Sequence, residues 1–281
     1  MNSRILITGA TGNVGREVIR VFPEKSLLRA AVSDMGRACD NQIEHIHFNF
    51  EDAATYPSAL QDVRSVFLMR PPQISNVKKY IAPVIDAAQA AGVEHIVFLS
   101  IVGVDKNPLV PHHKIENLLR ASGMDWTFLR ASFFMQNLNT THREEIGVRG
   151  EIAVPVGKSK TSFIDVRDIG AIGAKALTEP GYRNHAYTLT GSEALDYFQI
   201  ADTMTSVLGK PIRYVNPSLP RFVRAQLTAG RPLGFTLVMS ALYTLTRFGT
   251  AATVTQDTEN LLGRPPILFR QYVEDYCHAW E

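Results

Sequence analysis

The first half of the sequence alternates short apolar runs with longer segments of helical period, and this alternation most constrains the fold. The runs are rich in β-branched residues and are bounded by Gly, Pro and polar residues, which is typical of buried parallel strands. We expect strands at Arg4–Thr8, Leu28–Val32, Glu44–Phe48, Ser65–Met69, His95–Ser100 and Trp126–Leu129. We expect helices between them at Val14–Phe22, Ala53–Leu60, Ser75–Ala91 and His113–Ser122. The pattern predicts an α/β fold built on a doubly wound parallel sheet.

This rhythm weakens after Ala131, where segments punctuated by Gly and Pro are mixed with helices. We expect helices at Val166–Leu177 and Phe198–Leu208. The second half is therefore predicted to form a smaller C-terminal α/β lobe on the substrate side. We place the division between residues 1–135 and 136–281, with the second part interleaved with the first and not folding independently.

Charge and cysteine content exclude several classes of protein. The chain carries 29 Lys and Arg against 27 Asp and Glu, so a net charge of +2 provides no field that would attract nucleic acid. Its two cysteines, Cys39 and Cys277, lie far apart and outside any CxxC spacing. This argues against a disulfide framework and a zinc site, and no metal is expected. A reducing cytoplasm fits best.

No membrane partner is expected from the hydropathy pattern. The first predicted strand begins so close to Met1 that we expect no signal peptide. The most apolar stretch, "GFTLVMSALYTLT" at 234–246, is shorter than the roughly 18 residues of a spanning helix. We interpret it as a buried or pocket-lining helix flanked by Arg231 and Arg247.

Three glycines separate the first predicted strand from the first helix in "ILITGATGNVGREVIRVF". A strand that leads through a glycine turn into a helix points unpaired N–H groups at an anion. Gly9 allows a sharp turn, Gly12 allows a phosphate to approach, and Gly15 allows the helix to pack closely on the strand. The spacing is GxxGxxG and not GxGxxG; a generic glycine-rich turn is the alternative, but the position favours a dinucleotide.

Several stretches together resemble one family. "TGATGNVG" is the form seen in atypical short-chain dehydrogenase/reductases, and later stretches narrow the resemblance: "GVEHIVFLS", "HHKIENLLRASGMDWTFLRASFFMQNL", "FIDVRDIG", "YTLTGSEAL" and "LLGRPPILFRQYVEDY". Nearly the whole chain resembles the NmrA-like, triphenylmethane-reductase-like branch. The resemblance implies a Rossmann-type NAD(P)-binding domain with a small C-terminal lobe. It also implies that the protein is either a reductase or a non-catalytic sensor of its cofactor.

The end of the second strand decides between NAD and NADP, because an acidic side chain there binds a ribose diol and a basic one accepts a 2′-phosphate. In "AAVSDMGR", Ser33 stands where family members often carry arginine, and Asp34 follows. Arg37 matches a second basic position. Ser33 and Arg37 favour NADP, with NAD possible; a solvated surface arginine is the alternative for Arg37.

Other cofactor contacts follow from the resemblance and from strand ends. Within the glycine turn and helix start they are Thr11, Asn13 and Val14. After the third strand, the family segment that borders adenine matches Asn49 and Phe50, although Phe50 also fits a core position. After the fourth strand we expect Met69, Arg70 and Pro71, since ligands lie outside the carboxyl ends of such strands. A salt bridge is the alternative role for Arg70.

The usual proton donor for carbonyl reduction is missing. Short-chain dehydrogenases use a Tyr-xxx-Lys pair, in which the lysine lowers the pKa of the tyrosine. Lys114 is the natural lysine and a candidate for both catalysis and cofactor binding, but Val110 stands four residues before it. Hydride transfer to an electron-poor quinone, iminium ion or cationic dye needs no proton in the same step. Such a reaction depends mainly on alignment of the reacting carbons.

Catalytic candidates besides Lys114 are Ser100, at the end of the fifth strand, and His113. Of the adjacent histidines His112 and His113, we expect His113 to donate a proton near neutral pH. A surface or capping role is the alternative for both. For an aromatic substrate we expect Phe133, Phe134 and Asn137 to form a wall, although both rings also fit a core. Segments carrying Phe222, Phe235, Met239 and Tyr243 are candidates for a lid.

The sequence supports three functional hypotheses. The first is an NADPH-preferring reductase of a small planar electron-poor compound, such as a quinone, imine or dye. The second is a non-catalytic NAD(P)-binding redox sensor that regulates a protein partner. An isomerase or lyase that keeps the nucleotide only as structure is the third. A homodimer is possible; no nucleic-acid partner is expected.

Overall fold

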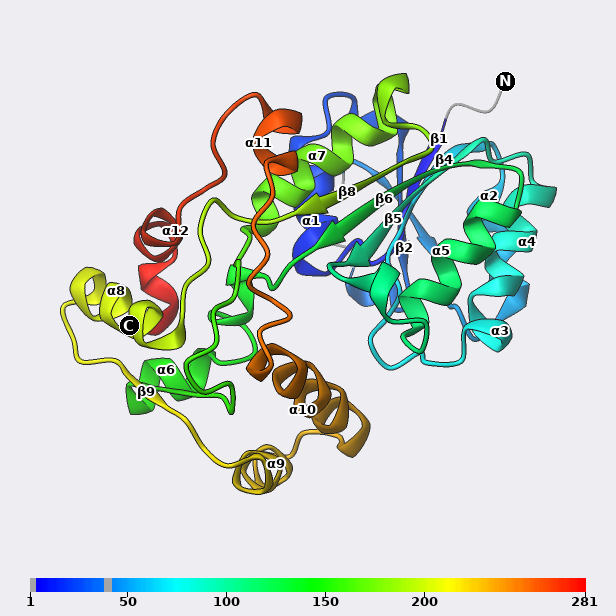
Figure 1. The fold of residues 1–281 in the computed structure, drawn as a ribbon. Coiled ribbons are helices and arrows are strands. Elements are labelled where there is room, and N and C mark those ends of the chain that lie inside the picture. The colour runs from blue at the N-terminus through cyan, green and yellow to red at the C-terminus, as the bar shows by residue number, and fades with distance from the viewer. Residues whose placement is uncertain (1–3, 38–41) are drawn as a thin grey trace. The chain divides into compact units, whose positions relative to one another are not determined.

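The chain forms two compact units in the computed structural model, which describes residues 4–37 and 42–281. Unit 1 lies within residues 1–131 and 166–189, and unit 2 comprises 132–165 and 190–281 (Figure 1). The division differs from a single boundary after residue 135. The chain returns to unit 1 at 166–189 because it contributes another strand to the parallel sheet.

Unit 1 contains a seven-stranded sheet in the order β3-β2-β1-β4-β5-β6-β8, in which every neighbouring pair is parallel. Its strands are β1 Arg4–Ile7, β2 Leu28–Val32, β3 Glu44–His47, β4 Val63–Leu68, β5 His95–Ile101, β6 Asp125–Ala131 and β8 His185–Leu189. The six strands expected from the sequence are present with small shifts of their ends, and β8 is additional. The predicted doubly wound, Rossmann-like sheet is confirmed.

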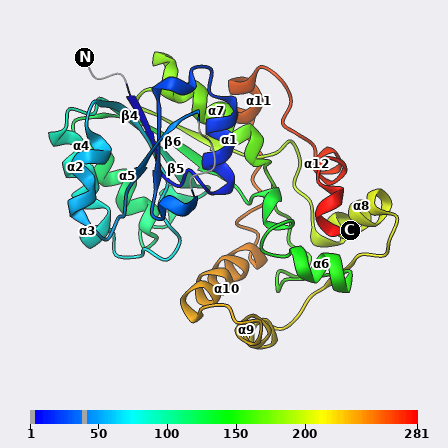
Figure 2. The same ribbon diagram turned by 180° about the vertical axis from the view of Figure 1, so that it is seen from behind.

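Helices cover both faces of this sheet. In unit 1 they are α1 Asn13–Val21, α2 Tyr56–Leu60, α3 Val77–Tyr80, α4 Ala82–Ala90, α5 Pro111–Ala121 and α7 Val166–Thr178. Figures 1 and 2 show α1 and α7 together on one face and α2, α4 and α5 on the other. The helices α1 and α7 pack so closely that a Cβ at Gly170 would lie 2.6 Å from the Cβ of Glu17.

The strand order reverses between β1 and β4, and this reversal positions the candidate site. In a doubly wound sheet, the connections from neighbouring strands diverge at such a point and leave a crevice outside their carboxyl ends. Here the segments that follow these strands are the glycine turn after Ile7 and the segment 69–76 after Leu68. The predicted nucleotide contacts at both segments therefore lie beside the switch point.

Unit 2 consists mainly of helices and has an aromatic core. Its elements are α6 Arg143–Arg149, β7 Glu151–Ala153, α8 Tyr197–Leu208, β9 Arg213–Val215, α9 Leu219–Thr228, α10 Leu233–Arg247, α11 Asp257–Leu262 and α12 Phe269–Asp275. The short strands β7 and β9 are parallel. The core includes the fully buried side chains of Phe222, Tyr272 and Trp280.

The stretch predicted as a buried or pocket-lining helix forms α10, but its apolar side is not buried. Leu233, Leu237 and Leu245 are exposed, whereas Tyr243 on the other side is buried. The prediction of a buried helix is therefore wrong for this side. Among the described residues, no helix combines the length and the apolar character needed to cross a bilayer.

Candidate functional site

The glycine turn after β1 is held by contacts that a side chain would prevent. Gly9 has a φ of 62°, in the left-handed region that favours glycine. The N–H of Gly12 donates to the carbonyl oxygen of Gly9 at 2.9 Å and closes the turn. A Cβ at Gly15 would lie 2.3 Å from that same oxygen. The start of α1 thus packs tightly on the turn at Gly9 and Ala10, whereas the prediction for Gly15 concerns packing of the helix on the strand.

The start of α1 provides backbone donors for an anion. Gly12 is the N-cap residue in an extended conformation, and no side chain caps the helix. No acidic residue occupies the first turn. The first N–H groups of a helix lack intrahelical partners and carry partial positive charge. This uncapped, acid-free helix start beside a glycine turn fits the diphosphate of a dinucleotide.

Met69 lies directly over the glycine turn. Its Cε is 2.0 Å from the position that a Cβ of Gly9 would take, and 3.4 Å from that of Gly12. The neighbouring Thr8 ties β1 to β4: its hydroxyl accepts from the N–H of Met69 at 2.7 Å and donates to the carbonyl of Phe67 at 3.0 Å. The structure therefore brings Met69 together with the predicted phosphate turn.

Arg70 folds back onto its own loop. Its Nη1 donates to the carbonyl oxygens of Pro71 at 2.8 Å, Pro72 at 3.1 Å and Ile74 at 2.6 Å. Within residues 4–37 and 42–281 no ion pair of Arg70 is found, which disfavours the alternative of a salt bridge. Burial lowers the pKa of the guanidinium, and its Nε has no hydrogen-bond partner. Arg70 thus retains a positive charge and one unused donor beside the switch point.

The adjacent histidines have different environments. Burial, together with the charge of Arg70, lowers the pKa of His112 to about 3, so this ring is neutral at physiological pH. It stacks on Phe98 with 5.8 Å between the ring centroids. The Nδ1 of His113 lies 3.0 Å from the carbonyl oxygen of Val104. A carbonyl oxygen only accepts hydrogen bonds, so Nδ1 carries a hydrogen, and Nε2 is the ring nitrogen that takes no part in this bond.

Ser100 belongs to a buried charged network. Its hydroxyl donates to Oε1 of Glu116 at 2.7 Å, and both residues are 2% exposed. Arg130 donates to the same carboxylate from Nε at 3.1 Å and from Nη2 at 2.8 Å. Arg120 adds a bond to Oε2 at 3.0 Å. The hydroxyl of Ser100 is thus engaged with Glu116, and the hydrogen bond to Glu116 raises the pKa of Arg130.

Several predicted residues lie apart from this network. Ser33 is exposed just after β2. Arg37 ends a 3₁₀ turn at Met35–Arg37. The Asn49 side chain accepts from the N–H of Glu51 at 3.0 Å. Phe50 is 6% exposed and packs edge-on against Phe48 in the core, as its alternative role required.

Around the turn and α5, the remaining predicted residues differ in exposure. Thr11 and Pro71 are half-buried, and Asn13 is exposed at the first position of α1. Val14 is buried. Lys114 is exposed on α5. Cys39 lies outside the described residues.

The predicted substrate wall belongs to unit 2. Phe133 stacks on Tyr243 with ring centroids 6.3 Å apart, and Phe134 pairs with Ile164 through a β-bridge. The carbonyl oxygen of Asn137 accepts from the N–H of His142 at 3.0 Å. Phe133, Phe134 and Asn137 are half-buried. Of the lid candidates, Phe222 and Tyr243 are core residues.

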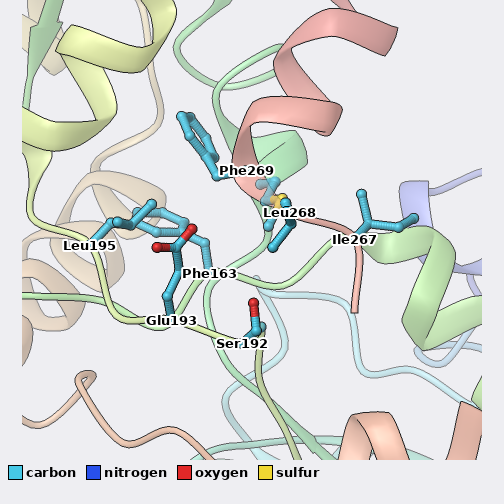
Figure 3. A pocket seen from close by; sticks show the side chains of 9 residues that line it. Phe163, Ser192, Glu193, Leu195, Ile267, Leu268 and Phe269 are labelled. Atoms are coloured by element: carbon cyan, nitrogen blue, oxygen red, sulfur yellow. The ribbon is translucent and has the colours of Figure 1, made fainter. Parts of the chain in front are cut away.

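Unit 2 also contains a small hollow, shown in Figure 3. Its cavity volume is about 10 Å³, and Phe163, Leu195 and Phe269 provide apolar walls, with Glu193 beside them. Pockets for drug-sized ligands occupy about 300–1,000 Å³. The hollow is thus too small for a dye or a dinucleotide. Among the described residues, no group of three or more His, Cys, Asp or Glu could hold a metal ion.

Sequence reasoning missed the partners of Ser100. Glu116 and Arg130 lie 14 positions apart on α5 and β6, so no short motif joins them. Arg130 offered one usable signal, because a charged residue within the apolar run "WTFLRA" requires a partner when the strand is buried. The chain also buries His142 and Tyr243, whose Nε2 and hydroxyl lie 2.7 Å apart in unit 2.

A family and a relative of known activity match this chain over most or nearly all of its length. Residues 1–256 match the NmrA-like family. The chain is 34% identical to an NAD(P)H azoreductase of Xenophilus azovorans, covering 98% of this chain and 99% of the relative.

The solved structures with folds similar to this one include two reductases. An NADPH-dependent quinone oxidoreductase of Escherichia coli, solved with NADPH, has a TM-score of 0.86 and 27% identity, covering 97% of this chain and 99% of that one. The Citrobacter sp. triphenylmethane reductase with NADP(H) has a TM-score of 0.85 at 24% identity, with coverage of 97% and 99%. At that identity the second likeness concerns the fold alone.

Proposed function

The chain belongs to the NmrA-like family, and from this premise we propose that it is an NADPH-preferring reductase of planar, electron-poor organic compounds. The acceptor is a quinone, an imine or a dye. The observation that carries the proposal is the uncapped start of α1 beside the turn at Gly9 and Gly12. The azoreductase and quinone oxidoreductase named above support the acceptor class.

Binding is assigned to the residues beside the switch point. The N–H groups at the start of α1 hold the diphosphate. The terminal methyl of Met69 moves aside to admit it; this carbon ends a flexible side chain and only packs on the turn. Arg70 adds positive charge and its unused Nε donor. Arg37, after β2, accepts the 2′-phosphate and favours NADP over NAD.

The proposed hydride transfer requires little from the protein beyond alignment of the two reacting carbons. When bound, NADPH would supply a hydride, which an electron-poor acceptor can take without a prior proton. Val110 is the extended N-cap residue of α5, so no tyrosine stands four residues before Lys114. His113, in its doubly protonated form with Nδ1–H bonded to the Val104 carbonyl, then supplies the Nε2 proton that completes reduction of a quinone to a hydroquinone.

The test is to mix the protein with NADPH and a panel of quinones, imines and cationic dyes while following the absorbance of the reduced nicotinamide. We expect oxidation of NADPH with at least one acceptor and slower oxidation of NADH. Tight NADPH binding without turnover of any acceptor would instead favour the non-catalytic sensor.

The proton donor is tested by His113→Asn. Loss of general acid catalysis is expected to lower kcat about 100-fold with a quinone. NADPH affinity, measured by calorimetry, should change little. His47→Asn is the matched control, because His47 is an exposed histidine on β3 away from the switch point. An unchanged kcat in His113→Asn would remove His113 from the mechanism.

A further inference from the structure

Helix α10 of unit 2 turns its apolar side outward. The exposed fractions of its side chains and of Phe248, which follows it, lie between 36% and 78% at Leu233, Leu237, Val238, Leu242, Leu245 and Phe248. At 100° per residue these positions share one side of the helix. We call this set the leucine face. The side chains of this set carry no polar group, and the hydroxyl of Thr244 on the same side donates to the carbonyl oxygen of Ser240 at 2.7 Å.

The opposite side of α10 is buried and mixed in character, because it carries hydroxyl groups beside Met239, which packs on the aromatic core. Thr236, Ser240 and Tyr243 are at most 7% exposed. The hydroxyl oxygens of Thr236 and Ser240 have no hydrogen-bond partner. Helices at the surface of a globular protein normally show the reverse arrangement, with the apolar stripe inside. The outward leucine face is therefore a feature that needs an occupant, since water solvates it poorly.

The surrounding segment is purely cationic. From residue 203 to 256 the sequence contains no Asp or Glu, but it contains Lys210, Arg213, Arg221, Arg224, Arg231 and Arg247. Arg221 and Arg224 are exposed on α9, which packs against α10. Arg231 and Arg247 stand at the two ends of α10. Apolar surface and positive charge without negative charge thus occur together.

We propose that the α9–α10 hairpin docks on an anionic lipid surface. The leucine face enters the boundary between headgroups and acyl chains, and the arginines contact lipid phosphates. A second copy fits less well, because two such faces would bring the arginines of both copies together without any acidic residue from either segment. The proposal concerns peripheral binding and does not depend on the reaction assigned above.

Co-sedimentation with lipid vesicles tests the docking. We expect the full-length protein to sediment with vesicles of phosphatidylcholine and phosphatidylglycerol, but weakly with phosphatidylcholine alone, and high salt should release it. The double variant Leu237→Ser, Leu245→Ser should bind about tenfold more weakly or worse, since two exposed leucines would no longer enter the acyl-chain boundary. Arg224→Gln should weaken binding about fivefold.

Val148→Ser is the matched control, because Val148 is 79% exposed on α6 and outside the leucine face. It should sediment like the unmodified protein, and circular dichroism should show that every variant is folded. Equal sedimentation of the double variant, or none of the unmodified protein, would overturn the proposal. The proposal would also be overturned if light scattering showed that the unmodified protein is a dimer, that only the double variant is a monomer, and that the dimer does not bind vesicles. The leucine face would then be covered by a second copy.

Discussion

The glycine turn after β1 and the charged network that joins β5, α5 and β6 are two regions of unit 1 built in opposite ways. At the turn, the missing side chains of Gly9 and Gly15 leave room for close backbone contacts. At the network, Ser100, Glu116 and Arg130 fill their space and satisfy one another. The first region leaves the start of α1 without a side-chain cap, and the second uses its donors internally.

This difference shows what substitution does in each region. An added carbon at Gly15 forces the backbone of the turn apart, whereas removal of the Glu116 carboxylate leaves Arg130, whose side chain is 16% exposed, with Asp105 at 4.0 Å as its remaining acidic partner. The penalty for an uncompensated buried charge exceeds that of a modest steric clash. Variants in the network should therefore lose more stability, and variants in the turn should lose relatively more cofactor affinity.

The largest effect is expected for Glu116→Leu. Arg130, whose side chain is 16% exposed, would lose both of its bonds to the carboxylate. Breaking a buried pair in this way costs about 3–5 kcal/mol, and we expect a loss of about 4 kcal/mol in urea unfolding. Glu94→Gln is the control, since the Arg64–Glu94 pair is about half-exposed and should contribute less than about 1 kcal/mol. Similar losses in both variants would refute this account.

The next largest effect is expected for His95, a buried histidine that the fold keeps neutral. Burial, then the charge of Arg183, lowers the pKa of His95 from 6.5 to about 4. The unfolded chain protonates His95 first as the pH falls. The contribution of this histidine to stability is therefore complete above pH 6.5 and is lost as the pH falls to about 4. This shift corresponds to about 3 kcal/mol. His95→Gln should remove that part of the pH dependence, and an unaltered profile of unfolding free energy against pH would contradict it.

A smaller effect on stability is expected for Gly15→Ala. The new Cβ would lie 2.3 Å from the carbonyl oxygen of Gly9, and overpacking of this kind costs about 1–3 kcal/mol. Calorimetric titration with NADPH should show a larger proportional loss, because the turn that presents the N–H groups is displaced. Gly181→Ala has nothing within 4 Å of its new Cβ and should behave as the unmodified protein. Normal NADPH binding by Gly15→Ala would contradict the proposal that the turn presents N–H groups to the cofactor.

The same contrast explains what the sequence could predict. The turn was visible because a short spacing, Gly9 to Gly15, fixes its backbone, and the alternation of apolar runs predicted six of the seven sheet strands. The network was not visible, because Glu116 and Arg130 meet only through the packing of α5 on β6. The outward side of α10 was also missed, since an apolar run does not reveal which side a protein buries.

Ser100→Ala gives the smallest effect and separates two roles that the sequence and the geometry assign to one hydroxyl. The sequence suggests catalysis, whereas the hydroxyl is buried and donates to Glu116 at 2.7 Å. Glu116 keeps its bonds from Arg130 and Arg120 in the variant, so the loss in unfolding free energy should be about 1 kcal/mol. We expect kcat for the best acceptor to stay within about twofold, since each 1.36 kcal/mol of barrier would change it tenfold. A large fall in kcat at unchanged stability would return Ser100 to the reacting groups and would mean that the network, like the glycine turn, opens to a ligand.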